Sequence, residues 1–404
     1  MITLKIAARN IFRQRRRSFL TGLTMLGGLV LFSLSIGLLE GSYGDIIDLF
    51  TSDHTGHIQI HQQGYLERPT IYNTIDDAGI LEERLRDYPD VKALTPRLYS
   101  TALSFIGKKT TVVRIIGIDP VKEGKTMRLP DMINEGRFLS EIPANEVIIG
   151  AGAAEILHAG IGDEISLLGQ GADGSIAHDS YRIIGIIGRK NGSYNRINCY
   201  MHLQEAQRLL ALENRVHEIA IILRHQDKSR KVAEQLAENL DAHGVAVAPW
   251  QIVEKQFYMA MQADTQGAYV MQGIIMLIVA IGVLNTVLMT ILERTREFGV
   301  LRALGTRPMV IFRLILYETG ILSLISIVFG SLISWGGNYY FSIYGIAFPP
   351  VEWAGFVFET MRSEVNFKTF WLPGTVTFCT AVIVSIFPAL RAARVTPVKA
   401  MRFY

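Results

Sequence analysis

The sequence has little cysteine, because its 404 residues include only Cys199 and Cys379, which lie far apart in unlike contexts. Two such cysteines exclude a disulfide framework and a zinc site built from clustered thiolates. The mean hydropathy is also higher than that of a typical soluble protein. Hydrophobic residues make up 49% of the chain and its mean hydropathy is +0.26, so membrane spans are the first feature to search for.

A complete nucleotide-binding loop is absent as well. Residues Gly169 to Ser175 (GQGADGS) have the glycine spacing of a phosphate loop but lack the lysine that reaches the phosphates. The GKT at Gly124 to Thr126 lacks the glycine expected five positions earlier. We interpret both stretches as turns. No nucleophile with a neighbouring base stands out, so an enzyme is the weakest of the function classes, and no catalytic or cofactor-binding residue is predicted.

Three histidines come close together in HTGHIQIH, at His54, His57 and His61. Imidazole is a common zinc ligand, but no acidic or thiol ligand with suitable spacing stands nearby. The alternation of polar and apolar residues in HIQIHQ is typical of a half-buried strand. We therefore predict a strand with His57, Gln59 and His61 on its solvated face, and no metal site.

Four stretches are long and apolar enough to cross a bilayer as helices, which takes about 20 residues each. The first is too long for the apolar region of a signal peptide, and no small-residue cleavage site follows it. The sequence therefore predicts an α-helical membrane protein with four transmembrane helices and a large α+β domain between helices 1 and 2. The stretches run from Ser18 to Leu39, Gly267 to Leu292, Val310 to Ile333 and Phe370 to Leu390.

Lysine and arginine predict the orientation. Residues 1–17 and 391–404 carry basic residues and no acidic ones, and the stretch from Glu293 to Arg313 has five Arg against two Glu. With four spans, all three segments lie on one side, which we assign to the cytoplasm. Residues 45–265 carry 30 Asp and Glu against 23 Lys and Arg, and we place them on the outer side.

The outer domain reads as α+β. Asp76 to Asp87 has the pattern of a helix, and LTPRLYSTALSFI and TTVVRIIGI read as strands. Glycine-rich residues 136–212 read as a small β subdomain inserted in the first. HEIAIILR, the helix SRKVAEQLAENLDAHG and VAVAPW predict a β-α-β unit over residues 217–250. The parts before and after the insertion are expected to form one α/β layer.

A charged segment, ERTREFGVLRALGTRP, joins the second and third spans from Glu293 to Pro308. Phe298, Leu301 and Leu304 recur at helical spacing, Gly305 stands where a helix ends, and Pro308 suits the start of the next helix. Two interpretations follow from the residues. The segment is an amphipathic helix lying on lipid or on its own bundle, or it is a docking helix for a cytoplasmic partner.

The docking interpretation is favoured by a resemblance to the FtsX-like permease family of ABC transporters. ERTREFGVLRALG resembles that family's coupling segment, E-x-x-x-E-[FI]-G-[VI]-L-[RK]-A-[LM]-G, and FPALRAARVTPVKAMRF resembles its C-terminal ending. ARNIFRQRRRSFLT resembles its basic entry helix. In the outer domain, GHIQIH, GIDP and NEVIIG…GIGDEISL are similar to pieces of the MacB-type periplasmic core, most of all that of lipoprotein-releasing permeases of the LolC/LolE kind.

The resemblance implies a division of the chain. It comprises a basic entry helix (1–17), helix 1 with its stalk (18–44), a MacB-like periplasmic core (45–265), helix 2 (266–292), a coupling helix (293–308), helix 3 (309–336), a periplasmic loop (337–369), helix 4 (370–390) and a cytoplasmic tail (391–404). The implied residues for coupling to an ATPase are Glu293, Arg294, Glu297, Phe298, Leu301, Arg302, Leu304 and Gly305.

The resemblance also implies partners. Cytoplasmic ATPase subunits would bind the ATP, and this chain would bind no cofactor. A second permease chain, identical or paralogous, membrane lipids and a periplasmic lipoprotein or carrier would complete the set, without nucleic acid. The implied location is the bacterial inner membrane. The implied role is mechanotransmission, in which ATP-driven movement of the coupling helix moves the outer domain to handle lipoproteins or other amphiphiles.

The stalk residues leave two interpretations open. Ile46, Ile47, Phe50, Phe257 and Met261 either line an outward-opening substrate cleft or pack one stalk against the other. The function also has an alternative, in which the same movement regulates a periplasmic hydrolase or sensor and transports nothing. Glu318, inside the third span, is expected to have a structural role, either protonated or paired with Arg313 or another chain.

Overall fold

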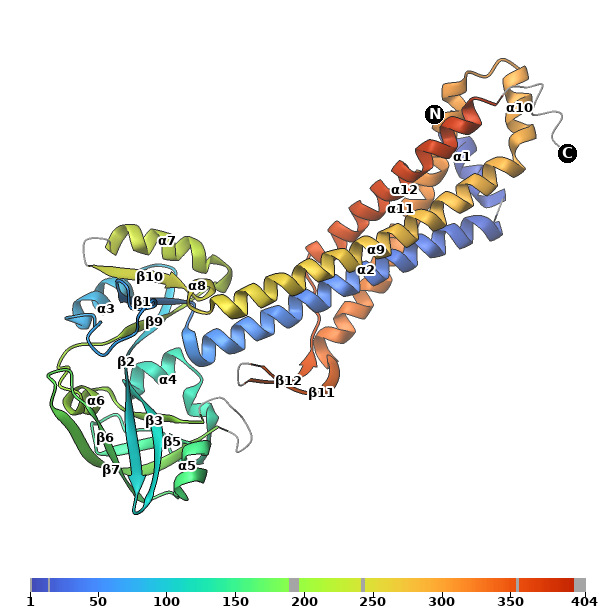
Figure 1. Cartoon of the computed structure of the whole chain (residues 1–404). Coiled ribbons are helices and arrows are strands. Elements are labelled where there is room, and N and C mark those ends of the chain that lie inside the picture. Colours follow the sequence, from blue (N-terminus) through green and yellow to red (C-terminus); the bar gives the residue numbers. More distant parts are fainter. Residues whose placement is uncertain (1, 14, 189–195, 241–243, 354–355, 396–404) are drawn as a thin grey trace. The chain divides into compact units, whose positions relative to one another are not determined.

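The computed structural model describes residues 2–13, 15–188, 196–240, 244–353 and 356–395, and it contains two compact units (Figure 1). The helical unit comprises residues 1–44, 261–348 and 360–404, and the sheet unit comprises residues 45–260 and 349–359. Pro397, Ala400 and Arg402, which carry part of the C-terminal family motif, lie outside the described residues.

Four long helices confirm the four predicted spans. α2, α9, α11 and α12 are each long and apolar enough to cross a membrane. Their buried faces form one core, which includes Met25, Val279, Val283, Ile311 and Ala389. A hairpin of β11 (Ile346–Trp353) and β12 (Phe356–Met361) precedes α12. The helices are α1 (Ile2–Arg13), α2 (Arg15–Phe50), α9 (Lys255–Glu293), α10 (Thr295–Ala303), α11 (Pro308–Tyr344) and α12 (Lys368–Ala393).

Small residues let the helices of this unit approach closely. A Cβ added to Gly28 of α2 would lie 2.1 Å from the Val279 side chain of α9, and these two helices run alongside each other in Figure 1. A Cβ at Gly37 would lie 2.2 Å from Oδ1 of Asn338 on α11. That amide donates to Ser33 Oγ at 3.1 Å and accepts from Ser363 Oγ at 2.6 Å. Close backbone contact and buried hydrogen bonds therefore hold α2 in the bundle, as in other membrane proteins.

The sheet unit contains one large sheet with the order β10-β1-β9-β2-β3-β8-β5-β7-β4, and β6 pairs with β2 and β7. Its strands are β1 (Ile58–Gln62), β2 (Val91–Ile106), β3 (Lys109–Ile118), β4 (Ile133–Gly136), β5 (Glu146–Gly150), β6 (Glu164–Gln170), β7 (Ile176–Ile187), β8 (Asn198–His202), β9 (Glu218–Leu223) and β10 (Val245–Pro249). Its helices are α3 (Ala78–Arg86), α4 (Pro120–Thr126), α5 (Ala151–Leu157), α6 (Leu203–Leu209), α7 (Ser229–Leu240) and α8 (Trp250–Val253).

The predicted α/β layer is present, but the predicted insertion is not a separate sheet. β9, α7 and β10 form the expected β-α-β unit, with β1 antiparallel between the two strands. α3 and α7 pack on this part of the sheet and bury Leu85 and Leu236. The long strand β2 then continues into the second half, where its Leu98 joins another core. The β subdomain thus begins within β2 rather than at residue 136.

A buried ion cluster lies within the sheet unit. Arg97 on β2 donates from Nη2 to Glu123 Oε1 at 2.6 Å and lies 3.3 Å from Glu218 Oε1 through Nη1. Thr95 Oγ1 donates to the other oxygen of Glu123 at 2.8 Å. All three charged side chains are at most 5% exposed. Arg97 also donates to the backbone carbonyl of His54, which lies in the π-helical turn after α2.

The prediction that His57, Gln59 and His61 share a solvated face is wrong. β1 is an inner strand between β10 and β9, and all three side chains are buried. His57 Nδ1 accepts from the Leu223 amide at 2.9 Å, and both ring nitrogens of His61 have protein partners, Gln59 Oε1 and the His217 carbonyl. Burial lowers the pKa of His57 to about 4, so the ring is neutral. Among the described residues, no three or more His, Cys, Asp or Glu side chains gather as metal ligands would.

α2 and α9, the two helices that contain the predicted stalk residues, connect to neighbouring strands of this sheet. The π-helical turn η1 (Thr51–Thr55) follows α2 and leads into β1. β10 leads through α8 into α9, and Ile58 of β1 pairs directly with Pro249 of β10. The Trp250 amide donates to the His57 carbonyl at 3.1 Å, so a further hydrogen bond joins the residue before β1 to the residue after β10.

Candidate functional site

The predicted coupling segment forms a short helix between two spans. α9 ends at Glu293, α10 covers Thr295–Ala303, and α11 begins at Pro308. Gly305 has φ +89°, a left-handed conformation that glycine adopts readily, and the Thr306 amide donates to the Leu301 carbonyl at 3.0 Å. The predicted helix end at Gly305 is confirmed.

The apolar residues of α10 divide into a buried and an exposed set. Phe298 is completely buried in the core of the helical unit, whereas Leu301 is 37% and Leu304 is 78% exposed. Steps of three residues rotate by about 60° on a helix of 3.6 residues per turn, so the three side chains do not form one edge. Val300, which is 47% exposed, accompanies the two leucines. The surface available to a partner is therefore Val300, Leu301 and Leu304, and Phe298 packs within the chain.

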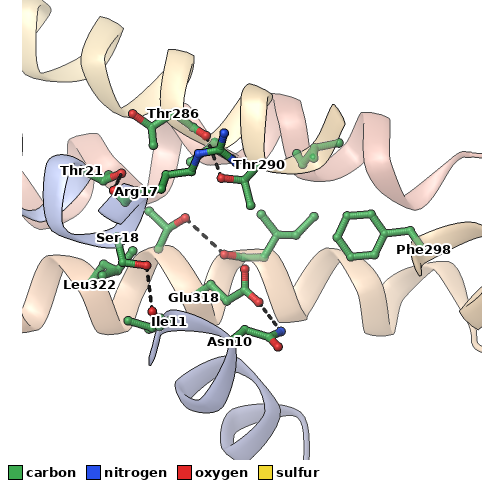
Figure 2. A pocket seen from close by; sticks show the side chains of 14 residues that line it. Asn10, Ile11, Arg17, Ser18, Thr21, Thr286, Thr290, Phe298, Glu318 and Leu322 are labelled. Atoms are coloured by element: carbon green, nitrogen blue, oxygen red, sulfur yellow. Dashed lines mark hydrogen bonds between the residues drawn. The ribbon is translucent and has the colours of Figure 1, made fainter. Parts of the chain in front are cut away.

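A buried ion pair fixes the start of α10 to α11. Arg294 Nη1 donates to both carboxylate oxygens of Glu318, at 2.9 and 3.0 Å, and the guanidinium lies over the Phe298 ring at 5.1 Å. Asn10 of α1 donates to Glu318 Oε1 at 2.6 Å, as Figure 2 shows. The expected pairing of Glu318 with Arg313 is wrong, because the carboxylate contacts Arg294 and Arg313 is exposed.

Two further ion pairs connect the coupling segment to the basic N-terminal region. Arg17 makes a bidentate pair with Glu293, with both N–O distances 2.5 Å, and Arg13 pairs with Glu297. Burial disfavours the charged form of Glu297, but hydrogen bonds from Arg294 and Arg13 outweigh it and lower the pKa of this carboxyl. The acidic residues of the predicted coupling set thus have partners in their own chain.

Arg302 folds back on its own segment, where Nη1 donates to the Thr306 carbonyl at 3.0 Å.

The opposite charges of the N-terminal arginines and of Glu293 and Glu297 are the signal in the sequence that would have predicted the Arg17–Glu293 and Arg13–Glu297 pairs.

A cavity behind Phe298 is too small for a substrate. Figure 2 shows Phe298, Glu318 and Thr290 among the side chains that line it. Its volume is about 40 Å³, roughly enough for a water molecule. The residues around it serve to position α10, and the exposed surface of α10 is the part that can contact another molecule.

Glu318→Gln is expected to destabilise the permease by about 2 kcal/mol, because Arg294 would lose a charge-assisted hydrogen bond in a buried site. The matched control is Glu293→Gln, whose carboxylate is 47% exposed and pairs with Arg17, with an expected effect below about 1 kcal/mol. Thermal unfolding of both variants in detergent measures the difference. Equal midpoints for the two would contradict the role given to Glu318.

The predicted cleft residues lie near the point where the stalks meet the sheet unit. The rings of Phe50 and Phe257 stack with centroids 5.2 Å apart, and Phe257 also lies 6.1 Å from Trp250. Both phenylalanines are buried. For Phe50 and Phe257, the stacked rings are the packing of one stalk against the other that was the alternative to a substrate cleft. Ile46, Ile47 and Met261 are half-buried, and their role in a cleft stays a prediction.

The two stretches with phosphate-loop glycines have different local structures. Gly169 to Ser175 spans the turn between β6 and β7, as expected. The prediction of a turn at Gly124 to Thr126 is wrong, because these residues form the last turn of α4.

These features define a class of protein. Four helices able to cross a membrane, a large α+β unit between the first and second, and a short helix between the second and third are the architecture of a multi-pass membrane protein. Residues 18–239 match the MacB-like periplasmic core domain, and residues 269–397 match the FtsX-like permease C-terminal region. The chain belongs to the MacB/FtsX family of ABC transporter permeases.

Distant relatives cover most of the chain. The lipoprotein-releasing system transmembrane protein LolC of Neisseria meningitidis is 20% identical over 98% of each chain. LolE of Haemophilus influenzae is 22% identical over 85% of this chain and 84% of its own. The macrolide export ATP-binding/permease protein MacB of Shewanella oneidensis is 23% identical over 98% of this chain but only 60% of its own length.

Proposed function

We propose that this permease couples ATP hydrolysis by separate cytoplasmic ATPase subunits to movements of its periplasmic domain, which handle lipoproteins or other amphiphiles. The observation that carries the proposal is the exposed surface of Val300, Leu301 and Leu304 on a helix whose base is fixed by the Arg294–Glu318 pair. An apolar surface on a firmly held helix can bind a partner and transmit its displacement to α9 and α11, the two helices that flank it.

A separate ATPase is supported by the comparison with LolC. That relative is named as a transmembrane protein of a lipoprotein-releasing system, and the match covers 98% of each chain. The proposed substrate class is supported by the names of LolC and LolE, which are lipoprotein-releasing proteins. The proposed location is the bacterial inner membrane.

Copurification tests the proposed function. We expect the permease, extracted in mild detergent from its native membrane, to bring with it an ATPase and a bound lipoprotein or lipid that mass spectrometry identifies. Recovery of the permease without any ATPase would overturn the proposal. Recovery of an ATPase together with a periplasmic hydrolase or sensor, and no amphiphile, would favour the regulatory alternative.

The topology gives a separate prediction. Lysine and arginine place α10 in the cytoplasm and the sheet unit outside, so His178→Cys should react with an impermeant thiol reagent in intact spheroplasts and Arg296→Cys should not. Both positions are exposed. The background is Cys379→Ala, which removes the exposed native cysteine and keeps the buried Cys199. Labelling of Arg296→Cys before permeabilisation would contradict the topology.

A further inference from the structure

The sheet unit contains a pocket that the proposed function does not use. Its volume is about 460 Å³, much larger than the cavity behind Phe298 and within the size range of small-molecule sites. Segments far apart in the sequence line it, namely the end of α2, the start of β2, the end of α4 and the end of β9. The charged side chains in its lining are Asp48, Lys92, Lys125, Arg128, Asp131 and Arg224.

Basic side chains outnumber acidic ones in this lining. Four cations and two carboxylates leave it a net charge of +2. Arg128 is already paired with Asp48. Lys92, Lys125 and Arg224 are exposed, and none of them forms an ion pair with another described residue. The pocket therefore has positive charge available for an anion.

His57 adds a hydrogen-bond donor to the same lining. Its Nδ1 accepts from the Leu223 amide at 2.9 Å, so the hydrogen of the neutral ring lies on Nε2. The residue is only 5% exposed, and Nε2 has no hydrogen-bond partner among the described residues. Buried donors in folded proteins are nearly always paired, so an acceptor bound in the pocket would satisfy this one.

The end of α4 opposes an anion only weakly. A helix C-terminus carries about half an elementary negative charge, and α4 is seven residues long. Lys125 lies on that same turn and outweighs it with a full positive charge. The GKT stretch at Gly124 to Thr126 thus lines a pocket suited to an anion, although it is helical and lacks the glycine pattern of a nucleotide-binding loop.

We propose that this pocket binds a phosphate group, held by Lys92, Lys125 and Arg224 and by the Nε2–H of His57. A phosphate monoester carries a charge of about −1.5 to −2 at neutral pH and has three strong acceptor oxygens, which suits a net charge of +2 and several donors. A volume of about 460 Å³ also accommodates an organic group on the phosphate. That group belongs to a soluble ester or to a membrane lipid, and the site requires neither the ATPase nor the exposed surface of α10.

Ligand titration of the full chain, purified without phosphate in a nonionic detergent, tests the proposal by calorimetry. The ligands are inorganic phosphate, glycerol 3-phosphate and dihexanoyl phosphatidic acid below its micelle concentration. Lys92→Gln combined with Lys125→Gln should weaken binding of glycerol 3-phosphate by at least about tenfold, because two charge-assisted contacts are lost. The matched control is Lys108→Gln combined with Lys109→Gln, which removes the same charge at exposed positions outside the pocket. Its Kd should change by less than about twofold, because distant exposed charges are screened by salt.

His57→Asn isolates the contribution of the imidazole. The asparagine retains an acceptor near the position of Nδ1 for the Leu223 amide and removes the Nε2–H donor. Affinity for glycerol 3-phosphate should fall by about three- to tenfold, because one hydrogen bond is lost. A thermal unfolding scan of the same preparation checks that this variant folds, and the two lysine variants decide the test if it does not.

The ligands distinguish the two sources of the phosphate. Tighter binding of dihexanoyl phosphatidic acid than of glycerol 3-phosphate supports the site and identifies a lipid, whereas equal binding supports the site and identifies a soluble ester. No saturable binding of any of the three ligands, or an equal loss in both double-lysine variants, would overturn the proposal. Neither outcome affects copurification of the ATPase, so failure of this site and failure of the proposed function are seen separately.

Discussion

Leu301→Asp and Leu304→Asp are expected to reduce recovery of the partner ATPase with this permease by at least about 100-fold. Leu301 on α10 is 37% exposed and Leu304, the residue that follows α10, is 78% exposed, and ion pairs hold the start of the helix in place. Docking would bury them in a groove of the ATPase. An aspartate there is an unpaired charge in an apolar contact, which costs several kcal/mol and is enough to break a modest interface.

The measurement is a pull-down of the ATPase with tagged permease, at permease levels matched by immunoblot. Phe12→Asp is the control, because Phe12 is 70% exposed on α1 and lies outside the proposed docking surface. If α10 only lies on lipid, neither leucine variant affects the complex. Normal ATPase recovery with both leucine variants would remove the coupling role of this helix.

Arg97→Met is expected to lower the free energy of unfolding of the sheet unit by about 3–5 kcal/mol, the second large effect. The substitution leaves Glu123 and Glu218 without their common cation in a site where each is at most 5% exposed. It also removes the donor to the His54 carbonyl in the turn after α2. Reactivity of the buried Cys199 thiol against urea concentration, on the full chain in detergent, reports this unfolding.

Arg215→Met is the matched control for this variant. Arg215 pairs with Asp76 at 3.0 Å, but both side chains are more than half exposed, so the expected loss is at most about 1 kcal/mol. Replacing Arg97, Glu123 and Glu218 together by apolar residues should recover much of the stability, since no charge is then left unpaired. A loss in Arg97→Met no greater than in Arg215→Met would show that the cluster is not what stabilises this unit.

Sequence periodicity was sufficient for most of the elements. Long apolar runs determine helices in a membrane, and short apolar or alternating runs determine strands, so the spans and most strands of the sheet unit were predictable, whereas β4 and the β11–β12 hairpin were not predicted. The end of α10 at Gly305 followed from local backbone preference. These features depend on residues close in the chain.

Features that depend on distant residues were not predictable in the same way. The polar face of β1 is buried because other segments cover it. The Tyr65 ring stacks on His61 at 4.8 Å, and Gln59 donates to the Thr55 carbonyl at 2.9 Å. Glu318 finds Arg294 rather than the nearer Arg313 because the end of α9 returns beside α11. Phe298 fits the apolar pattern of a docking edge, yet the fold turns it inward.

The paired ends of β1 and β10 have a mechanical consequence. The chain enters the sheet unit from α2 and leaves it toward α9 through Ile58 and Pro249, which face each other in one strand pair. If α2 and α9 pull on β1 and β10 with equal force, the two strands are displaced together and do not slide past each other. A difference between the two pulls shears the pair along its length, and the hydrogen bonds of an antiparallel ladder resist shear together rather than one after another. A displacement that α2 or α9 transmits along the chain therefore acts first on the hydrogen bonds between β1 and β10.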